Sequence, residues 1–385
     1  MIITLIIFLI VLSLLVFVHE LGHFWTARRF GVRVDEFGFG IPPRICGIQK
    51  IGKKWKFTWG GRQITNEEPV IYSLNWIPIG GFVKIKGENG EDVAANDSFP
   101  SKPIGKRILI IAAGVIMNVV LCIVLLAIGY GFGMPGAVEG QSKYAKISNV
   151  QMQVVQVLKD SPAEKSGLKM GDELMSVGGI GIKSVDSLHD LLASKEGQSV
   201  RVDLVRAGQN ISVDITPQKI NDNVSLGIGL VQTGIIRYPW YIAIWQGVKT
   251  TFVWVWLIVA ALFSILKNLI IHKPLGIELS GPIGIAVMTG QAAKLGWVYL
   301  LQFTALLSIN LAIVNILPFP ALDGGRILFL IVEKFRGRAM KQKWENMANN
   351  IGFLILLGLI IAVSFRDITV YGGRIVGAFK GLIGL

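Results

Sequence analysis

The sequence predicts a mainly α-helical polytopic membrane protein with one α+β domain. Of the 385 residues, 52% are hydrophobic and 16% are charged, and the mean hydropathy is +0.57, so the chain is more apolar than an ordinary soluble enzyme. Long apolar runs recur along the chain, whereas residues 148–218 have the composition of a soluble domain. We therefore expect about four transmembrane helices, a membrane-associated cytoplasmic β region and one extracytoplasmic α+β domain.

The net charge of +13 raises the question of nucleic-acid binding. The Lys and Arg residues are spread along the chain and form no stripe with interleaved aromatic residues, so no nucleic-acid partner is predicted. Membrane topology explains these charges better, because basic residues gather in cytoplasmic loops. Cys46 lies in a predicted loop and Cys122 in a predicted span, so the cysteines indicate neither a disulfide framework nor a thiolate metal site.

The first predicted span covers residues 2–24, and residues 2–18 carry no charge. Arg28, Arg29 and Arg33 follow it, so the positive-inside rule places its C-terminal end in the cytoplasm. A secretory signal peptide is the competing interpretation. No Lys or Arg precedes the apolar run and no small-residue cleavage site follows it, so we predict a retained transmembrane helix.

The end of this span carries the motif His19-Glu20-Leu21-Gly22-His23. Positions i and i+4 of a helix share a face, so the two histidines can bind one zinc ion while Glu20 lies beside the remaining coordination position. Zinc lowers the pKa of bound water toward ~7, and Glu20 can accept the proton as the water attacks a carbonyl. A chance match is the alternative, but ionisable residues beside an apolar span are costly and indicate function.

Residues 31–104 contain short strand-like runs and predict a cytoplasmic β region. One interpretation is a small cytoplasmic sheet. The other is a hairpin whose apolar tip, residues 77–81, enters the membrane face and offers a strand edge to an extended substrate. In that case Gly80 and Gly81 are candidate substrate-binding residues.

Three further apolar segments are expected to contact the bilayer. Residues 108–131 form a second span, and their Asn118 suits an interhelical hydrogen bond, although we also count it as a candidate substrate-binding residue. Residues 238–271 are long enough to span, but their tryptophans favour an interfacial helix on the outer surface of the membrane. Residues 351–363 form a last span.

The segment Asp160–Leu174 resembles the S-P-A-x-x-x-G-L-x-x-G-D signature of bacterial PDZ domains. This resemblance implies a PDZ domain over residues 148–230, with a groove that takes an extended peptide or a C-terminal carboxylate by strand addition. Leu226, Gly227 and Ile228 resemble its binding loop and are candidate substrate-binding residues.

A span over residues 298–317 runs into a stretch interrupted by Pro318 and Pro320. Such a break frees backbone carbonyls and is tolerated at membrane depth only where it is buried in protein or lines a wet cavity. Asp323 follows as a lone carboxylate, and zinc bound by two histidines needs a third protein ligand. An ion pair between Asp323 and Arg326 is the alternative. Basic residues after 333 place this end in the cytoplasm as well.

Together, H-E-L-G-H at 19–23, N-I-L-P-F-P-A-L-D-G at 315–324, L-S-G-P-I-G-I-A at 279–286 and the PDZ-like segment between them resemble the bacterial site-2 protease family. The resemblance implies an intramembrane zinc metalloprotease. It assigns His19, His23 and Asp323 as Zn²⁺ ligands, Glu20 as general base, and Asn315 as a polar group that holds substrate or the oxyanion.

The same resemblance implies a multi-pass protein of the bacterial inner membrane, with the active site toward the cytoplasm and the PDZ domain outside. Implied substrates are single-span membrane proteins, such as anti-sigma factors, and remnant signal peptides. Implied partners are the lipid bilayer and an upstream site-1 protease that acts first.

The expected organisation is an N-terminal membrane part (1–135), a PDZ domain (148–230) and a C-terminal membrane part (238–385). A membrane-anchored PDZ scaffold without catalysis is the alternative function, but it gives no reason for an intramembrane Asp323 behind two prolines. A metal transporter would place several acidic or His residues across successive spans, and the sequence offers one such constellation.

Overall fold

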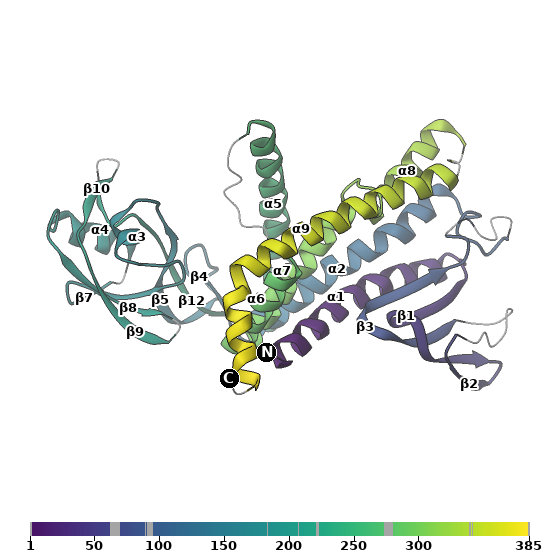
Figure 1. Cartoon of the computed structure of the whole chain (residues 1–385), viewed down its shortest axis with the longest axis horizontal. Coiled ribbons are helices and arrows are strands. Elements are labelled where there is room, and N and C mark those ends of the chain that lie inside the picture. The colour runs from purple at the N-terminus through teal and green to yellow at the C-terminus, as the bar shows by residue number, and fades with distance from the viewer. Residues whose placement is uncertain are drawn as a thin grey trace. The chain divides into compact units, whose positions relative to one another are not determined.

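The computed structural model forms two compact units. The helical unit comprises Met1–Ala127 and Ile244–Leu385, and the α+β unit comprises Ile128–Ala243 (Figure 1). The structure describes residues 2–61, 70–88, 90, 95–182, 184–206, 208–220, 223–272, 280–338, 340 and 342–383. Residues 62–69 and 91–94 of the predicted β region, and Leu279 of the L-S-G-P-I-G-I-A motif, lie outside the described residues.

The long helices follow the apolar runs of the sequence. Their bounds are α1 Ile2–Arg29, α2 Ile104–Phe132, α5 Trp240–Ile270, α6 Pro282–Leu295, α7 Trp297–Ile316, α8 Asp323–Arg336 and α9 Gln342–Ile383. Within the described residues, α1, α2, α5, α7 and the Gln342–Val370 part of α9 are long and apolar enough to cross a membrane. The predicted span 351–363 is thus the middle of a longer helix.

The fifth of these helices is α5, for which the tryptophans favoured an interfacial position. It is a continuous helix of 31 residues, so its length and hydropathy also permit a span. It packs against α2 where Gly247 approaches the backbone of Ile123, because a Cβ at Gly247 would lie 2.8 Å from the Ile123 carbonyl oxygen. Small residues that allow such close backbone approach are typical of helix contacts in membranes.

A three-stranded antiparallel sheet lies against α1 (Figure 1). Its strands are β1 Val34–Ile51, β2 Lys54–Trp59 and β3 Ile71–Ile85, in the order β2-β1-β3. Strand β3 folds back and pairs with β1 twice, so that Phe37 of β1 faces both Val83 and Tyr72 of β3. The Gly81–Ile85 half of β3 pairs with β1 on one side, and no partner strand on its other side is found among the described residues.

The tip of this hairpin is fixed to α1 by one hydroxyl group. Ser13 Oγ donates to the Pro78 carbonyl oxygen at 3.0 Å and accepts from the Gly80 N–H at 3.3 Å. Gly80 and Gly81 then lie directly on Val16 and Phe17, where a Cβ on Gly80 would be 2.7 Å from Val16 Cγ1. The turn of α1 that carries the histidine motif therefore begins beside the β3 tip.

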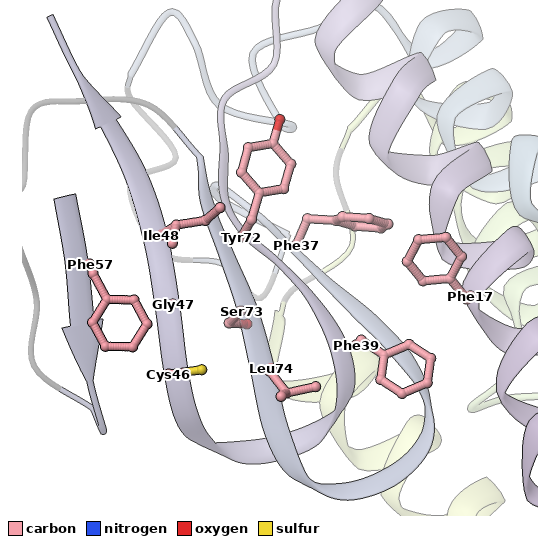
Figure 2. Close-up of a pocket in the computed structure, with 10 residues that line it drawn as sticks. All are labelled: Phe17, Phe37, Phe39, Cys46, Gly47, Ile48, Phe57, Tyr72, Ser73 and Leu74. Atoms are coloured by element: carbon pink, nitrogen blue, oxygen red, sulfur yellow. The ribbon is translucent and has the colours of Figure 1, made fainter. Parts of the chain in front are cut away.

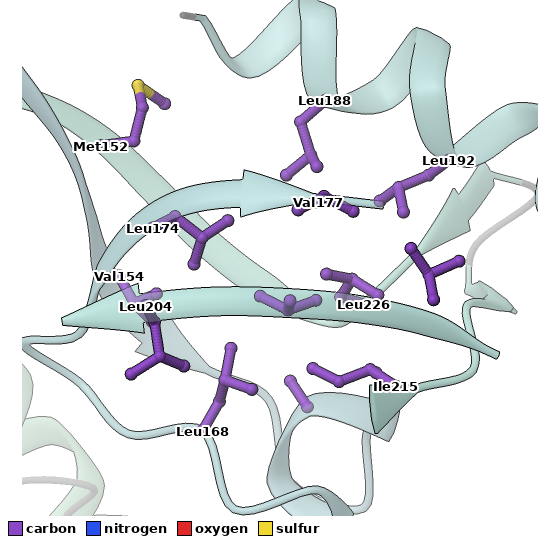
Figure 3. Close-up of a cluster of buried hydrophobic side chains, with 13 residues drawn as sticks. Met152, Val154, Leu168, Leu174, Val177, Leu188, Leu192, Leu204, Ile215 and Leu226 are labelled. Carbon is purple, nitrogen blue, oxygen red and sulfur yellow. The ribbon is translucent and has the colours of Figure 1, made fainter. Parts of the chain in front are cut away.

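The α+β unit is organised around a seven-stranded sheet and a core of aliphatic side chains (Figure 3). Its strands run in the order β4-β12-β5-β6-β8-β9, with β7 paired to β6, and β10 and β11 form a separate pair. The bounds are β4 Met134–Ala137, β5 Lys146–Val157, α3 Pro162–Lys165, β6 Glu173–Val177, β7 Ile180–Gly181, α4 Val185–Ala193, β8 Val200–Arg206, β9 Gln209–Ile215, β10 Gln218–Ile220, β11 Asn223–Ser225 and β12 Ile228–Arg237. Helix α4 starts with a capping box, because Ser184 and Ser187 each accept the other's backbone N–H.

Candidate metal centre

Three side-chain atoms from α1 and α8 converge on one point. His19 and His23 occupy successive turns of α1, and their Nε2 atoms are 3.2 Å apart. Asp323 is the first residue of α8, and its Oδ2 is 3.0 Å from His19 Nε2 and 3.5 Å from His23 Nε2. Two ligands held ~2.0–2.1 Å from zinc at the tetrahedral angle are ~3.3 Å apart. The triangle therefore has the size that a tetrahedral zinc site requires.

The surroundings of these three atoms also suit a cation. Asp323 Oδ2 is buried without a hydrogen bond to the described residues, and its near neighbours are the two imidazole nitrogens. His23 Nδ1 lies 2.9 Å from the Ile110 carbonyl oxygen, and His19 Nδ1 lies 3.2 Å from Asn118 Nδ2. A polar partner at Nδ1 fixes the ring and directs the Nε2 lone pair toward the metal. The residues present therefore fit a metal ion at this position.

Glu20 lies at the same site without being part of the triangle. The ligand atoms of His19, Glu20 and His23 are all within 4.8 Å of one another. Glu20 is half-buried, in contrast to the two buried histidines on either side of it. Glu20 would therefore lie beside a metal held by the two histidines, at the distance from which a general base could act.

The interruption between helices α7 and α8 brings Asp323 to the histidines. Helix α7 ends at Ile316, and Asp323 begins α8 after a short turn in which Ala321 has a positive φ of 74°. Gly324 permits this turn, because a Cβ there would lie 2.2 Å from the Ile316 carbonyl oxygen. Asn315, in the last turn of α7, approaches the site with its Nδ2 3.5 Å from His19 Nε2.

The alternative ion pair between Asp323 and Arg326 does not occur. The Arg326 guanidinium instead pairs with Glu88, which lies just after β3. A second pair, Arg107 with Glu333 at 2.7 Å, joins α2 to α8 nearby. These partners are 238 and 226 residues apart in the chain, so their pairing carries no local sequence signal.

The other candidate residues occupy three different environments. Gly80 and Gly81 lie against α1, as described above, and Asn118 is fully buried against His19 rather than at an open edge. Gly227 and Ile228 are in the α+β unit, at the start of β12.

Leu226, the third candidate residue of the α+β unit, precedes Gly227 and has a buried side chain. Its side chain is 1% exposed within the core of the α+β unit, and its carbonyl oxygen accepts from the Ala163 N–H (Figure 3). The side chain is therefore part of the core, while its backbone shapes the loop that leads into β12. The assignment of Leu226 to substrate binding stays a prediction.

Two groups near the site, Ser13 and the Ile110 carbonyl oxygen, are not among the residues predicted from the sequence. Ser13 could have been noticed as a polar residue within the charge-free run 2–18, six positions before His19. No sequence signal marks a backbone carbonyl such as that of Ile110.

An apolar hollow opens between α1 and the three-stranded sheet (Figure 2). Its volume is about 370 Å³. Aromatic and aliphatic side chains dominate its lining, which consists of Phe17, Phe37, Phe39, Cys46, Gly47, Ile48, Phe57, Tyr72, Ser73 and Leu74. Phe17 stands two positions before His19, so the hollow is adjacent to the turn of α1 that carries the motif.

Comparisons of the sequence with known proteins match nearly the whole chain. Residues 7–60 and 61–359 match the model of peptidase family M50. The chain belongs to this family. A Clostridium perfringens protein named "Putative zinc metalloprotease" is 32% identical over 364 residues, covering 94% of this chain and 97% of the relative. A Rhizobium meliloti protein of the same description is 30% identical over 388 residues, covering 94% and 95%.

Two solved structures of PDZ domains match part of the chain. The PDZ domain of an SdrC-like protein from Listeria monocytogenes is 27% identical, covers 22% of this chain and 92% of its own, and has a TM-score of 0.21. The corresponding domain from Listeria innocua is 24% identical, covers 21% and 92%, and has a TM-score of 0.20.

Membership of family M50 confirms the predicted family and makes this chain a metalloprotease. The several long apolar helices make it a multi-pass membrane protein.

Proposed function

We propose that this M50 protein is a zinc-dependent intramembrane endopeptidase in which His19, His23 and Asp323 hold the metal. The observation that carries the proposal is the triangle of ligand atoms, 3.0, 3.2 and 3.5 Å on its sides. Two of its corners, His19 and His23, lie on α1, a helix apolar enough to span a bilayer. When bound, zinc would supply Lewis-acid polarisation of the scissile carbonyl and lower the pKa of water.

The protein side chains divide the remaining steps. Glu20 takes the proton that the attacking water gives up and passes it to the nitrogen of the leaving amine. The Asn315 amide, 3.5 Å from His19, can donate a hydrogen bond to the oxyanion that develops on the scissile carbonyl.

A transmembrane helix must unwind before its peptide bonds can be attacked. The Gly81–Ile85 half of β3 offers a strand edge beside α1, and we propose that the unwound substrate pairs with it. Gly80 and Gly81 serve this role by letting the strand lie close to Val16 and Phe17.

The proposed substrates are single-span membrane proteins, such as anti-sigma factors, and remnant signal peptides, cut after an upstream site-1 protease. The arginines in the last turn of α1 and the basic residues in the last turn of α8 support an active site toward the cytoplasm of a bacterial inner membrane. We propose that the α+β unit acts as an extracytoplasmic PDZ module that limits access by bulky substrates, with Leu226, Gly227 and Ile228 in its peptide-binding loop.

Cleavage of a model transmembrane peptide by the purified full-length protein tests the proposal. A chelator should abolish cleavage and added zinc should restore it. Glu20→Gln should keep one bound zinc while turnover falls by ~10²–10⁴, because the substitution removes the base and no ligand. Unchanged turnover in Glu20→Gln would show that the base is misassigned. A wild-type protein with neither zinc nor cleavage would favour the noncatalytic scaffold.

A further inference from the structure

We propose that one face of α2, made of Ile110, Gly114 and Asn118, is an outer shell that orients both histidine ligands, with Asn118 as a positioning residue for His19. The proposal rests on the metal site proposed above. It assigns Asn118 a role in metal affinity, in place of the substrate contact expected from sequence.

The three residues are spaced four apart, so they line one side of α2. Ile110 and Asn118 each contact one imidazole: the Ile110 carbonyl oxygen lies 2.9 Å from His23 Nδ1, and the Asn118 amide lies 3.2 Å from His19 Nδ1. Both residues are almost completely buried. Each histidine therefore has its own partner on the same helix face.

Gly114 lies between these two partners and leaves room for the rings. A Cβ at this position would be 2.4 Å from His23 Nε2 and 2.8 Å from His19 Cε1. Both distances are shorter than real carbon contacts, and the nearest atom is a metal-ligating nitrogen. Any side chain at residue 114 would thus displace the ligand pair itself.

The Asn118 amide can serve His19 in both tautomers. When His19 Nε2 carries the proton and faces Asp323 Oδ2 at 3.0 Å, Nδ1 accepts from Asn118 Nδ2–H. When Nε2 binds a metal, the ring keeps its single proton on Nδ1, which then needs an acceptor. Asn118 Oδ1 is buried and has no partner among the described residues, so it is the acceptor that a half-turn of the amide supplies.

The Asn118 backbone is anchored as well. Its carbonyl oxygen accepts a hydrogen bond of 2.8 Å from Ser308 Oγ on α7, the helix that leads to Asn315. On the other side, a Cβ on Gly22 would lie 2.3 Å from the Ala113 carbonyl oxygen, so α1 and α2 cross at close contact. The amide is therefore held at a fixed distance from His19.

Equilibrium zinc competition against a fluorescent chelator, with the full-length protein in detergent, tests the role of Asn118. Asn118→Leu keeps the size of the side chain but removes the acceptor, and should weaken zinc binding by ~10–100-fold. Asn118→Asp keeps an acceptor. On a logarithmic scale of zinc affinity, this variant should recover at least half of the loss seen in Asn118→Leu. Asn118→Ala serves as a second acceptor-free variant if Asn118→Leu does not fold.

Asn310→Leu is the matched control. Asn310 lies on α7 and its side chain donates within its own helix, to the Leu306 carbonyl oxygen at 2.8 Å. Zinc affinity should be unchanged in this variant.

X-ray absorption at the zinc edge tests whether the absence of a side chain at Gly114 leaves room for the histidines. Gly114→Ala should show altered or lost histidine ligation. Ile116→Ala is the control and should show unaltered ligation, because Ile116 is 52% exposed.

Zinc affinity equal to wild type in Asn118→Leu or Asn118→Ala would overturn the proposal. So would an Asn118→Asp variant as weak as the Leu variant, because the contact would then be packing and not an acceptor. The proposed peptidase function fails separately: a wild-type protein that binds zinc tightly but cuts no transmembrane peptide refutes that function and leaves the Asn118 result standing.

Discussion

The two units of the molecule both bury apolar side chains, but the helical unit also buries many more polar ones. In the α+β unit, aliphatic residues such as Val154, Val177 and Leu204 are at most 1% exposed. In the helical unit, Asn118 and Ser308 are completely buried, and large apolar side chains such as Trp256, 73% exposed, face outward. A surface of this kind is stable against lipid and not against water. The apolar side chains on the surface of the helical unit therefore indicate that this surface contacts lipid.

The difference extends to what holds each unit together. The α+β unit is stabilised by removing apolar area from water, so its core side chains can be exchanged without touching chemistry. Lipid provides no such force between helices, which associate through close packing and hydrogen bonds. The buried polar groups of the helical unit are thus both its structural contacts and its metal site. Substitutions in the two units should separate activity from folding.

The largest expected effect is at the metal ligands. His23→Ala removes one corner of the triangle and should abolish both zinc binding and peptide cleavage, as measured by metal analysis and a peptide assay. His189→Ala is the matched control, because His189 is exposed on α4 of the α+β unit. It should leave both unchanged. Full zinc occupancy in His23→Ala would refute the ligand assignment and remove the functional contrast between the units.

The next effect is confined to the core of the α+β unit. Leu204→Ala should lower the free energy of unfolding of that unit by about 2–5 kcal/mol, because it leaves a cavity among closely packed side chains. Hydrogen exchange of its core amides, followed by mass spectrometry, measures this change. Zinc content and cleavage of a short peptide should be unaffected. Leu158→Ala, at a residue 40% exposed, should cost far less. Loss of zinc in Leu204→Ala would mean that the two units fold as one.

A smaller, pH-dependent effect is expected at the ion pair between Asp172 and Arg206, which is 2.7 Å long. Burial opposes ionisation of Asp172, but hydrogen bonds from Arg206 and the Lys169 N–H outweigh it, so the pKa of Asp172 lies below its usual value. A lowered pKa in the folded state contributes stability above the unfolded pKa of ~3.9, and this stability is lost as the pH falls further.

Arg206→Gln should therefore destabilise the α+β unit at pH 7 by about 1.5 kcal/mol, the lower end for a charged hydrogen bond, because Arg206 is partly exposed. The difference between variant and wild type should shrink near pH ~3, where Asp172 becomes protonated in the unfolded chain. Hydrogen exchange at both pH values measures it. An equal difference at the two pH values would show that packing, and not charge, stabilises the pair.

Local sequence patterns predicted much of the metal site. The spacing of His19 and His23 fixes their common helix face, and the prolines before Asp323 mark the break that leads it to the same site. The partners that complete the site are not local. Arg326 pairs with Glu88, and Asn118 meets His19, across 238 and 99 residues. Such contacts depend on how helices cross, which periodicity does not encode.

Strand β3 illustrates a second limit of the sequence. Alternating residues predicted strands in this region, but the double pairing of β3 with β1 depends on a backbone that reverses near Gly80, whose φ is +77°. Leu226 shows a similar limit, because a loop motif specifies backbone shape and does not predict that this side chain is buried in the core.

The smallest effect is expected at Ser13, a buried polar residue that is not a metal ligand. Its substitution tests whether this contact contributes to substrate binding. Ser13 makes two hydrogen bonds to the β3 tip, to the Pro78 carbonyl oxygen and from the Gly80 N–H. Ser13→Ala removes both, and a net loss of about 1 kcal/mol corresponds to a roughly fivefold change. If the β3 edge binds substrate, this change should appear as a higher KM for the transmembrane peptide with kcat and zinc content unchanged, because uniform binding is lost.

Ser13→Thr keeps the hydroxyl and should recover most of that KM, whereas Ser264→Ala, at an exposed serine on α5, should have no effect. A fall in kcat at unchanged KM would place Ser13 in the alignment of the catalytic turn of α1 instead of the substrate edge. Wild-type values of KM and kcat would mean that Val16 and Phe17 hold the hairpin tip without the Ser13 hydroxyl. In that case a buried polar side chain of the helical unit would have no role in substrate binding or catalysis.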